Sequence, residues 1–193
     1  AASDVYKRQV QDDPSFPKSV ENKIDDTSLE FSYKNNIEIV PTLICSTQSK
    51  ETDRTFGWDK AEWQKLTKLS SLGKDLDDFK PGCGSKTQEP GMEEQLAARF
   101  DKELLISRNI QLADLEDEIE SCYERGWSDG LPVVPPTTVR VIRMLRGTNR
   151  SPSEIIGNIP PDNVPCSIEK VAINAVLAGC KPDYFPVVLA SVE

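Results

Sequence analysis

The stretch that decides the predicted fold of the first part of the chain is Ile39-Val40-Pro41-Thr42-Leu43-Ile44. This apolar run, rich in β-branched residues, is typical of a buried strand. Pro41 has no backbone N–H to give to a sheet, so we expect it at the first residue of a strand or at a sheet edge. Val40 before it is biased toward extended backbone, and X-Pro is the one peptide bond whose cis form costs little.

A hairpin and a helix are predicted directly after this strand. Residues 52–56 are typical of a return strand, because they follow a polar turn. Gly57 comes next, and then two signals that open a helix over about 59–69. These signals are a capping box and a hydrophobic staple, formed by Asp59 with Glu62 and by Trp58 with Trp63.

This order of elements resembles the second half of a thioredoxin-type fold, over residues 26–69. Val40-Pro41-Thr42-Leu43 matches the cis-proline strand of that family, and Gly57 matches the glycine before its last helix. The resemblance implies that Val40, Pro41 and Thr42 bind a thiol substrate and form one wall of a redox site. The family's Cys-x-x-C pair stands about forty residues before the proline, at or before residue 1, so it matches no residue here.

A second pattern covers residues 123–192. Its signature is Gly126-Trp127-Ser128-Asp129-Gly130-Leu131-Pro132-Val133-Val134-Pro135-Pro136-Thr137, followed by Glu169-Lys170-Val171-Ala172-Ile173-Asn174-Ala175 and Ala178-Gly179-Cys180-Lys181-Pro182. It resembles a poorly characterised domain that bacterial proteins carry fused to redox domains of a Sec/Cys-Gly-Ser-Cys type. Trp127 and Asp129 are candidates to bind a substrate at a pocket mouth. Asp129 is equally well explained as a turn residue whose side chain accepts from nearby backbone amides.

Further helices are predicted from apolar periodicity and capping signals. One covers 26–35 with Thr27 as its cap, and the clearest amphipathic pattern covers 112–126. Others are expected at 92–100, 137–146, 151–156 and 167–179, and a last one from Pro182 or Pro186. Three arginines on one predicted helix form a solvated face or bind an anion, and these are Arg140, Arg143 and Arg146.

Composition divides the chain into four segments. Residues 1–9 include Asp4-Val5-Tyr6-Lys7-Arg8-Gln9, which resembles a translated transposon end from sequencing-library preparation, and we expect them to carry no fold information. Residues 10–69 are expected to be a partial thioredoxin-like domain, and 70–109 a Gly- and Pro-rich linker with a short helix. Residues 110–193 are expected to be a mostly helical partial domain, truncated at its C-terminal end. The predicted fold class is therefore α/β.

The cysteines and the missing histidines limit the chemistry. The chain has five cysteines and no histidine, which excludes His-assisted nucleophiles and the usual zinc sites, and we expect no metal and no cofactor. Thinly spread cysteines without Cys-x-x-C spacing favour a reducing compartment such as the cytoplasm. Cys83 is the candidate catalytic thiol, because it lies between two glycines and near Lys86, which would favour the thiolate. Alternatively, Cys83 is an ordinary turn cysteine.

Charge argues against two classes of partner. The chain contains 32 acidic and 23 basic side chains, for a net charge of −9, and such a protein repels phosphate backbones. No apolar run approaches the roughly 18 residues of a membrane span. We therefore expect neither nucleic acid nor membrane as a partner.

The leading functional hypothesis is thiol–disulfide exchange by a thioredoxin-like protein whose redox cysteines lie outside this chain. Its partner would be a thiol or disulfide substrate, either a protein or a small molecule, and the full-length protein would be the oxidoreductase. The alternative is a thioredoxin-like docking module without catalysis, attached to an enzyme domain of unknown substrate. A third hypothesis places the chemistry in the second domain, acting on a small organic substrate.

Overall fold

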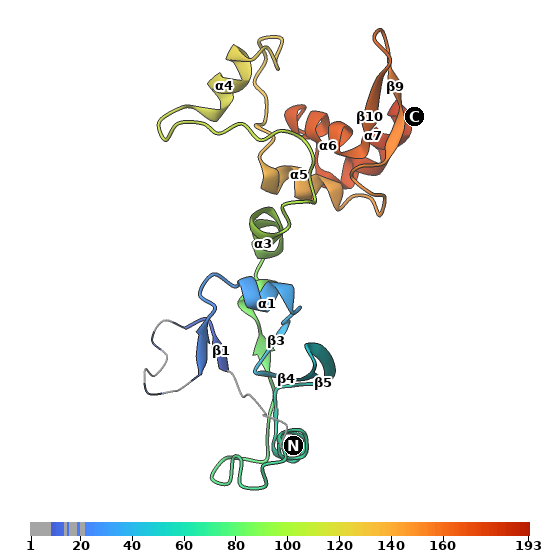
Figure 1. The fold of residues 1–193 in the computed structure, drawn as a ribbon. Coiled ribbons are helices and arrows are strands. Elements are labelled where there is room, and N and C mark those ends of the chain that lie inside the picture. Colours follow the sequence, from blue (N-terminus) through green and yellow to red (C-terminus); the bar gives the residue numbers. More distant parts are fainter. Residues whose placement is uncertain (1–8, 14, 16–18, 20–21) are drawn as a thin grey trace. The chain divides into compact units, whose positions relative to one another are not determined.

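The computed structural model describes residues 9–13, 15, 19 and 22–193 (Figure 1). Residues 1–8, which hold most of the stretch that resembles a transposon end, lie outside the described part. The chain forms two compact units, unit 1 (Ala1–Leu96) and unit 2 (Ala97–Glu193). In the described part, seven α-helices and five two-stranded sheets confirm a mixture of helix and strand. The boundary between the units falls within α3 (Met92–Phe100), where a helix was expected.

The first described strand of unit 1 is β1 (Gln9–Gln11). It pairs in parallel with β2 (Lys23–Asp25), and the short helix α1 (Glu30–Lys34) follows. The buried carboxylate of Asp26 accepts from the backbone N–H of Phe31 at 2.8 Å and of Ser32 at 2.9 Å. The prediction of a helix over 26–35 capped by Thr27 is therefore wrong at its start. Asp26 satisfies the first free amides of a shorter helix.

The stretch around Pro41 forms two strands with the proline between them. β3 (Ile39–Val40) precedes Pro41, and β4 (Thr42–Thr47) follows it and forms an antiparallel hairpin with β5 (Lys50–Phe56). The Val40–Pro41 peptide bond is cis. The expected hairpin is confirmed, and the proline stands outside both ladders because it has no N–H to give to either.

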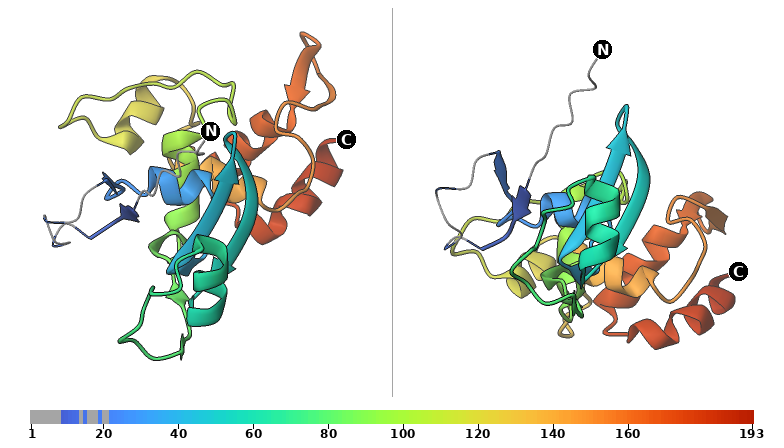
Figure 2. Two further views of the ribbon diagram at one scale, coloured as in Figure 1. Left: turned by 60° about the horizontal axis from the view of Figure 1, so that its bottom comes forward. Right: turned by 90° about the horizontal axis from the view of Figure 1, so that it is seen from below.

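Two tryptophans fix the start of α2 (Lys60–Thr67), which follows β6 (Trp58–Asp59) and lies beside the β4–β5 hairpin in both views of Figure 2. Asp59 caps α2 by accepting from the N–H of Glu62 at 3.1 Å, and the rings of Trp58 and Trp63 are 5.3 Å apart between centroids. Cap and staple are thus confirmed. In a capping box the Glu62 side chain would also accept from the backbone N–H of Asp59. This part of the prediction is wrong, because the Glu62 carboxylate accepts from the Thr55 hydroxyl at 2.6 Å.

Strand pairs also form in a region whose sequence predicts only loop. β7 (Phe79–Lys80) pairs with β6, and β8 (Cys83–Gly84) pairs antiparallel with β3, followed by the 3₁₀ turn η1 (Lys86–Gln88). Strands of two residues are too short to show any hydrophobic periodicity. Contacts across the chain, rather than a local pattern, therefore define them.

Two glycines allow the chain segments around Pro41 to meet. Gly57 has a φ of +68°, and a Cβ added to it would lie 2.8 Å from the backbone nitrogen of Gly82. A Cβ added to Gly82 would lie 2.3 Å from Cγ2 of Ile39 and 3.3 Å from Cα of Gly57. The N–H of Gly57 also donates to the carbonyl of Pro41 at 2.8 Å. Only residues without side chains permit this approach of backbones.

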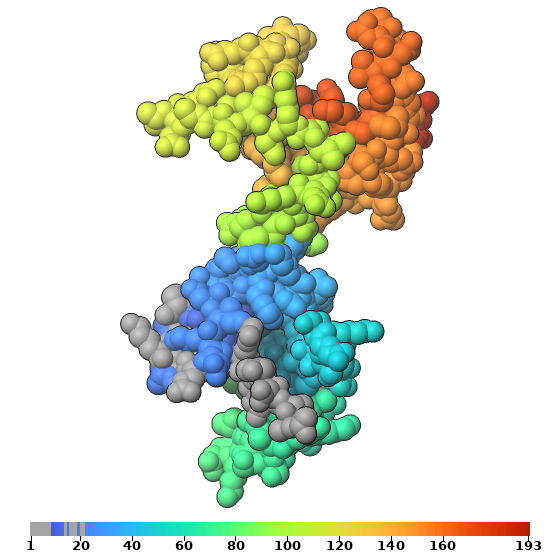
Figure 3. Space-filling view, in the orientation of Figure 1, coloured from blue at the N-terminus to red at the C-terminus, as the bar shows by residue number. Residues whose placement is uncertain are grey.

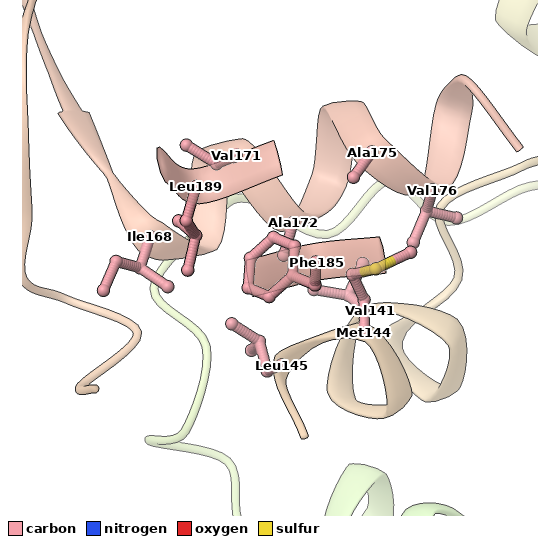
Figure 4. Close-up of a cluster of buried hydrophobic side chains, with 10 residues drawn as sticks. All are labelled: Val141, Met144, Leu145, Ile168, Val171, Ala172, Ala175, Val176, Phe185 and Leu189. Carbon is pink, nitrogen blue, oxygen red and sulfur yellow. The ribbon is translucent and has the colours of Figure 1, made fainter. Parts of the chain in front are cut away.

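Unit 2 is mostly helical and contains one hairpin. Its elements after α3 are α4 (Glu118–Glu124), α5 (Thr138–Leu145), β9 (Ile155–Ile159), β10 (Val164–Ser167), α6 (Ile168–Leu177), η2 (Pro182–Tyr184) and α7 (Phe185–Val192). The β9–β10 hairpin stands out from the helices of its unit in the space-filling view of Figure 3. α5, α6 and α7 enclose a core around the fully buried Phe185, as Figure 4 shows.

Several helix predictions in unit 2 are confirmed and two are wrong. α5 and α6 lie where helices were expected, and their N-caps are Thr137 and Ser167. The helix predicted over 112–126 begins only at Glu118, because Asp117 accepts from two backbone amides there and ends the irregular segment before it. The helix predicted over 151–156 is absent, because β9 begins at Ile155 and pairs with β10.

The described residues contain no helix with the length and hydropathy of a membrane span, and the longest helix, α6, has 10 residues. The five cysteines are all free thiols.

The contact between Gly57 and Gly82 can be tested with glycines on either side of Cys83. We expect Gly82→Ala to lower the free energy of unfolding of unit 1 by about 1–3 kcal/mol, because the new methyl group overpacks against Ile39. Gly84→Ala is the matched control, since a Cβ there meets nothing within 4 Å. Urea denaturation followed by tryptophan fluorescence measures both variants, and equal stability would contradict the close approach.

Candidate functional site

The predicted site residues of unit 1 come together at the pairing of β3 with β8. Val40 lies directly opposite Cys83 in this antiparallel ladder. Side chains opposite each other in such a pair lie on the same face, with Cβ atoms about 4.5–5.5 Å apart. Val40, Pro41 and Cys83 are all exposed, and we call these three residues the Pro41 surface. A thiol in a predicted linker thus lies beside the predicted substrate wall.

Buried polar groups hold β8 in this position. The N–H of Ser85 donates to the carbonyl of Glu38 at 2.8 Å, and the hydroxyl of Thr87 donates to the carbonyl of Ile37 at 2.6 Å. Ser85 and Thr87 are both buried, which excludes water as a competitor for these bonds. The short ladder is therefore extended on one side, and the backbone that carries Cys83 is fixed relative to Pro41.

Two neighbours of the Pro41 surface have partners within the chain. The hydroxyl of Thr42 donates to the carbonyl of Ile39, so this predicted substrate-binding side chain is bonded to the backbone three residues before it. The ammonium group of Lys86 lies 3.0 Å from the carboxylate of Asp12. Lys86 thus forms an ion pair of its own beside Cys83. Val40, Pro41 and Cys83 are the parts of the site that face outward.

The other cysteines differ from Cys83 in exposure. Burial raises the pKa of the Cys45 thiol, and Asp53 adds to this effect. Burial likewise raises the pKa of Cys122, which is 3% exposed in α4. Cys166 and Cys180 are half-buried at the two ends of α6. Among the five thiols, Cys83 is the exposed one.

Of the two predicted site residues of unit 2, Trp127 lines a cavity and Asp129 does not. The carboxylate of Asp129 accepts from the N–H of Leu131 at 3.2 Å, as expected for a turn residue. Trp127 lines an open cavity of about 820 Å³ that lies wholly within unit 2, and Asp129 is not part of its lining. This volume is in the range of small-molecule sites.

Glu169 is an important residue of this cavity that belongs to the second sequence pattern but was not among the predicted site residues. Its side chain is 1% exposed, and its carboxylate accepts from the backbone N–H of Ile106 at 3.0 Å and of Ser107 at 2.9 Å. These bonds attach the segment before α4 to the first turn of α6. The available signal was position, because Glu169 lies among the buried Ile168, Val171 and Ala172 on an otherwise apolar face.

We expect Glu169→Gln to lower the free energy of unfolding of unit 2 by about 1–3 kcal/mol, because an amide leaves one of the two N–H donors without a charged acceptor. Glu120→Gln, at an exposed position in α4, serves as the control and should leave stability unchanged. Thermal unfolding followed by circular dichroism measures both. Equal melting temperatures would show that the Glu169 carboxylate does not anchor the segment.

We expect iodoacetamide to alkylate Cys83 first at pH 7, because it is exposed, and Cys45 and Cys122 last. A raised pKa leaves less thiolate at a given pH, so the alkylation profiles of Cys45 and Cys122 should be shifted to higher pH. Peptide mapping by mass spectrometry gives the five rates. In urea the rates should converge, and rapid labelling of Cys122 in the folded protein would contradict its burial.

Comparison with known proteins adds no family to this geometry. No protein-family model, no curated protein and no solved structure matches the chain. The assignment of the two candidate sites therefore rests on the contacts described above.

Proposed function

We propose that unit 1 is the C-terminal half of a thioredoxin-like domain and that the protein acts in thiol–disulfide exchange. The order of elements supports this proposal: β3, Pro41, the β4–β5 hairpin, Gly57 and the capped helix α2. In this proposal unit 2 holds the start of a second domain, which the redox chemistry serves. A reducing compartment such as the cytoplasm suits the five free thiols.

The observation that carries the proposal is the register of Cys83 opposite Val40. It places an exposed thiol next to the apolar wall and the extended backbone on which a thiol substrate would lie. The chain has no Cys-x-x-C pair. Cys83 is therefore the thiol that we assign to the Pro41 surface, and a second thiol comes from the substrate, from glutathione or from a redox pair outside these residues.

The proposed reaction is an exchange that balances without a metal or a cofactor. The thiolate of Cys83 attacks one sulfur of a substrate disulfide RS–SR, forms the bond Cys83 Sγ–SR, and releases RS⁻, which takes a proton from water. A second thiolate, R′S⁻, then attacks the SR sulfur of the mixed disulfide, forms the bond R′S–SR and releases the Cys83 thiolate. Val40 and Pro41 would hold the substrate backbone so that its sulfur faces Cys83.

Exchange with oxidised glutathione tests this function in the full chain. We expect the mixed disulfide at Cys83 to form at least about tenfold faster than in an unstructured peptide of residues 79–88, a difference that corresponds to a modest 1.36 kcal/mol in the barrier. Intact mass and peptide mapping over time give both rates. The Cys83→Ser variant should lack the fast phase.

Gly82→Ala and Gly84→Ala provide the matched pair for this experiment. The first should slow exchange toward the rate of the peptide, because it displaces β8 from β3, whereas the second should leave the rate unchanged. Equal rates for the folded chain and the peptide would favour the alternative function, a docking module without catalysis. In that case the Pro41 surface binds a partner and Cys83 is an ordinary exposed thiol.

A further inference from the structure

The cavity of unit 2 is lined by charges of which only part is neutralised within the chain. Its carboxylates are Glu118, which lies 3.6 Å from Arg140, and Glu169, which is bonded to two backbone amides. Among its cations, Arg125 lies 3.6 Å from Glu116. The side chains of Arg108 and Lys170 have neither an ion pair nor a hydrogen bond in the described part of the chain.

The Glu169 anchor brings the chain segments that carry these two lining cations together. Ser107 donates its N–H directly to Glu169. Arg108 follows Ser107 in the sequence, and Lys170 follows Glu169, so each cation is one residue away from this hydrogen-bonded pair. Because the Glu169 charge is already compensated by two N–H donors, it leaves both cations available to an external anion.

A third polar group at this place also lacks a partner. The hydroxyl oxygen of Ser107 is buried, lines the cavity, and has no hydrogen-bond partner among the described residues. A buried polar atom without a partner costs free energy unless something bonds to it. A ligand oxygen placed between Arg108 and Lys170 would be able to accept from this hydroxyl.

The remaining lining combines apolar side chains with a few neutral polar ones, such as Asn109 and Asn174. Its apolar part includes residues of the segment before α5 and of α6, among them Trp127, Pro135, Pro136, Ile173 and Leu177. An apolar wall beside a few converging polar groups is the usual composition of a small-molecule site. From the two unpaired cations, the buried hydroxyl and the apolar wall, we propose that this cavity binds a small carboxylate with an apolar body.

Titration of the full chain with 4-phenylbutyrate tests the proposal, with the uncharged 4-phenylbutyramide as the matched probe. Calorimetry gives the affinity, and the indole N–H signals of Trp58, Trp63 and Trp127 in nitrogen-resolved NMR spectra report the place. We expect the carboxylate to bind at least about tenfold more tightly than the amide, and only the Trp127 signal to shift. Equal affinities, a shift at Trp58 or Trp63 instead, or no binding at millimolar concentration would overturn it.

Variants identify the groups that recognise the carboxylate. Arg108→Ala and Lys170→Ala should each lower the affinity for 4-phenylbutyrate about tenfold, as expected for a lost charge-assisted contact. Lys181→Ala removes an exposed cation of the same unit outside the cavity and should change nothing. Losses of affinity as small as that of Lys181→Ala would overturn the assignment of Arg108 and Lys170.

Ser107→Ala separates binding from stability. Removing a buried hydroxyl without a partner should maintain or raise the melting temperature of the free protein. It should also lower the affinity for 4-phenylbutyrate. Unchanged affinity would exclude Ser107 from the site. Inorganic phosphate, which has no apolar body, should fail to displace 4-phenylbutyrate at equal concentration, and displacement would reduce the site to a general anion site and overturn the proposal.

Discussion

The pairing of β3 with β8 is the constraint on which the Pro41 surface depends. Without β8, the carbonyls of Ile37 and Glu38 would lose the partners that Thr87 and Ser85 provide. The pairing in turn needs two glycines, because a side chain on Gly57 or Gly82 would separate the backbones that meet there. A ladder of two residues is stable here because buried hydrogen bonds and a close backbone contact continue it.

In unit 2 a buried charged group fixes irregular backbone in place. The segment before α4 is irregular and contributes little to the core around Phe185, so it needs an anchor of another kind. Glu169 supplies it, and two N–H donors offset the cost of burying its carboxylate. In both units, buried polar bonds fix a piece of irregular backbone, and the exposed groups of a candidate site stand on that backbone.

Features that depend on near neighbours in the sequence were predictable. The hairpin after Pro41, the Asp59 cap and the helix from Ser167 follow from local patterns, and the structure agrees with them. The pairing of Cys83 with Val40 was not predictable, because it joins distant segments through strands that are too short to show periodicity.

Local signals also misled the prediction where two of them competed. The apolar spacing from Leu112 favours a helix, yet Asp117 captures backbone amides five residues later, and Leu115 remains fully exposed. Cavity residues such as Ser107 and Arg108 gave no signal, because only the bonds to Glu169 bring them to α6. The sequence therefore predicted all three residues of the Pro41 surface but not that they meet, and of the second cavity it predicted only Trp127 as a site residue.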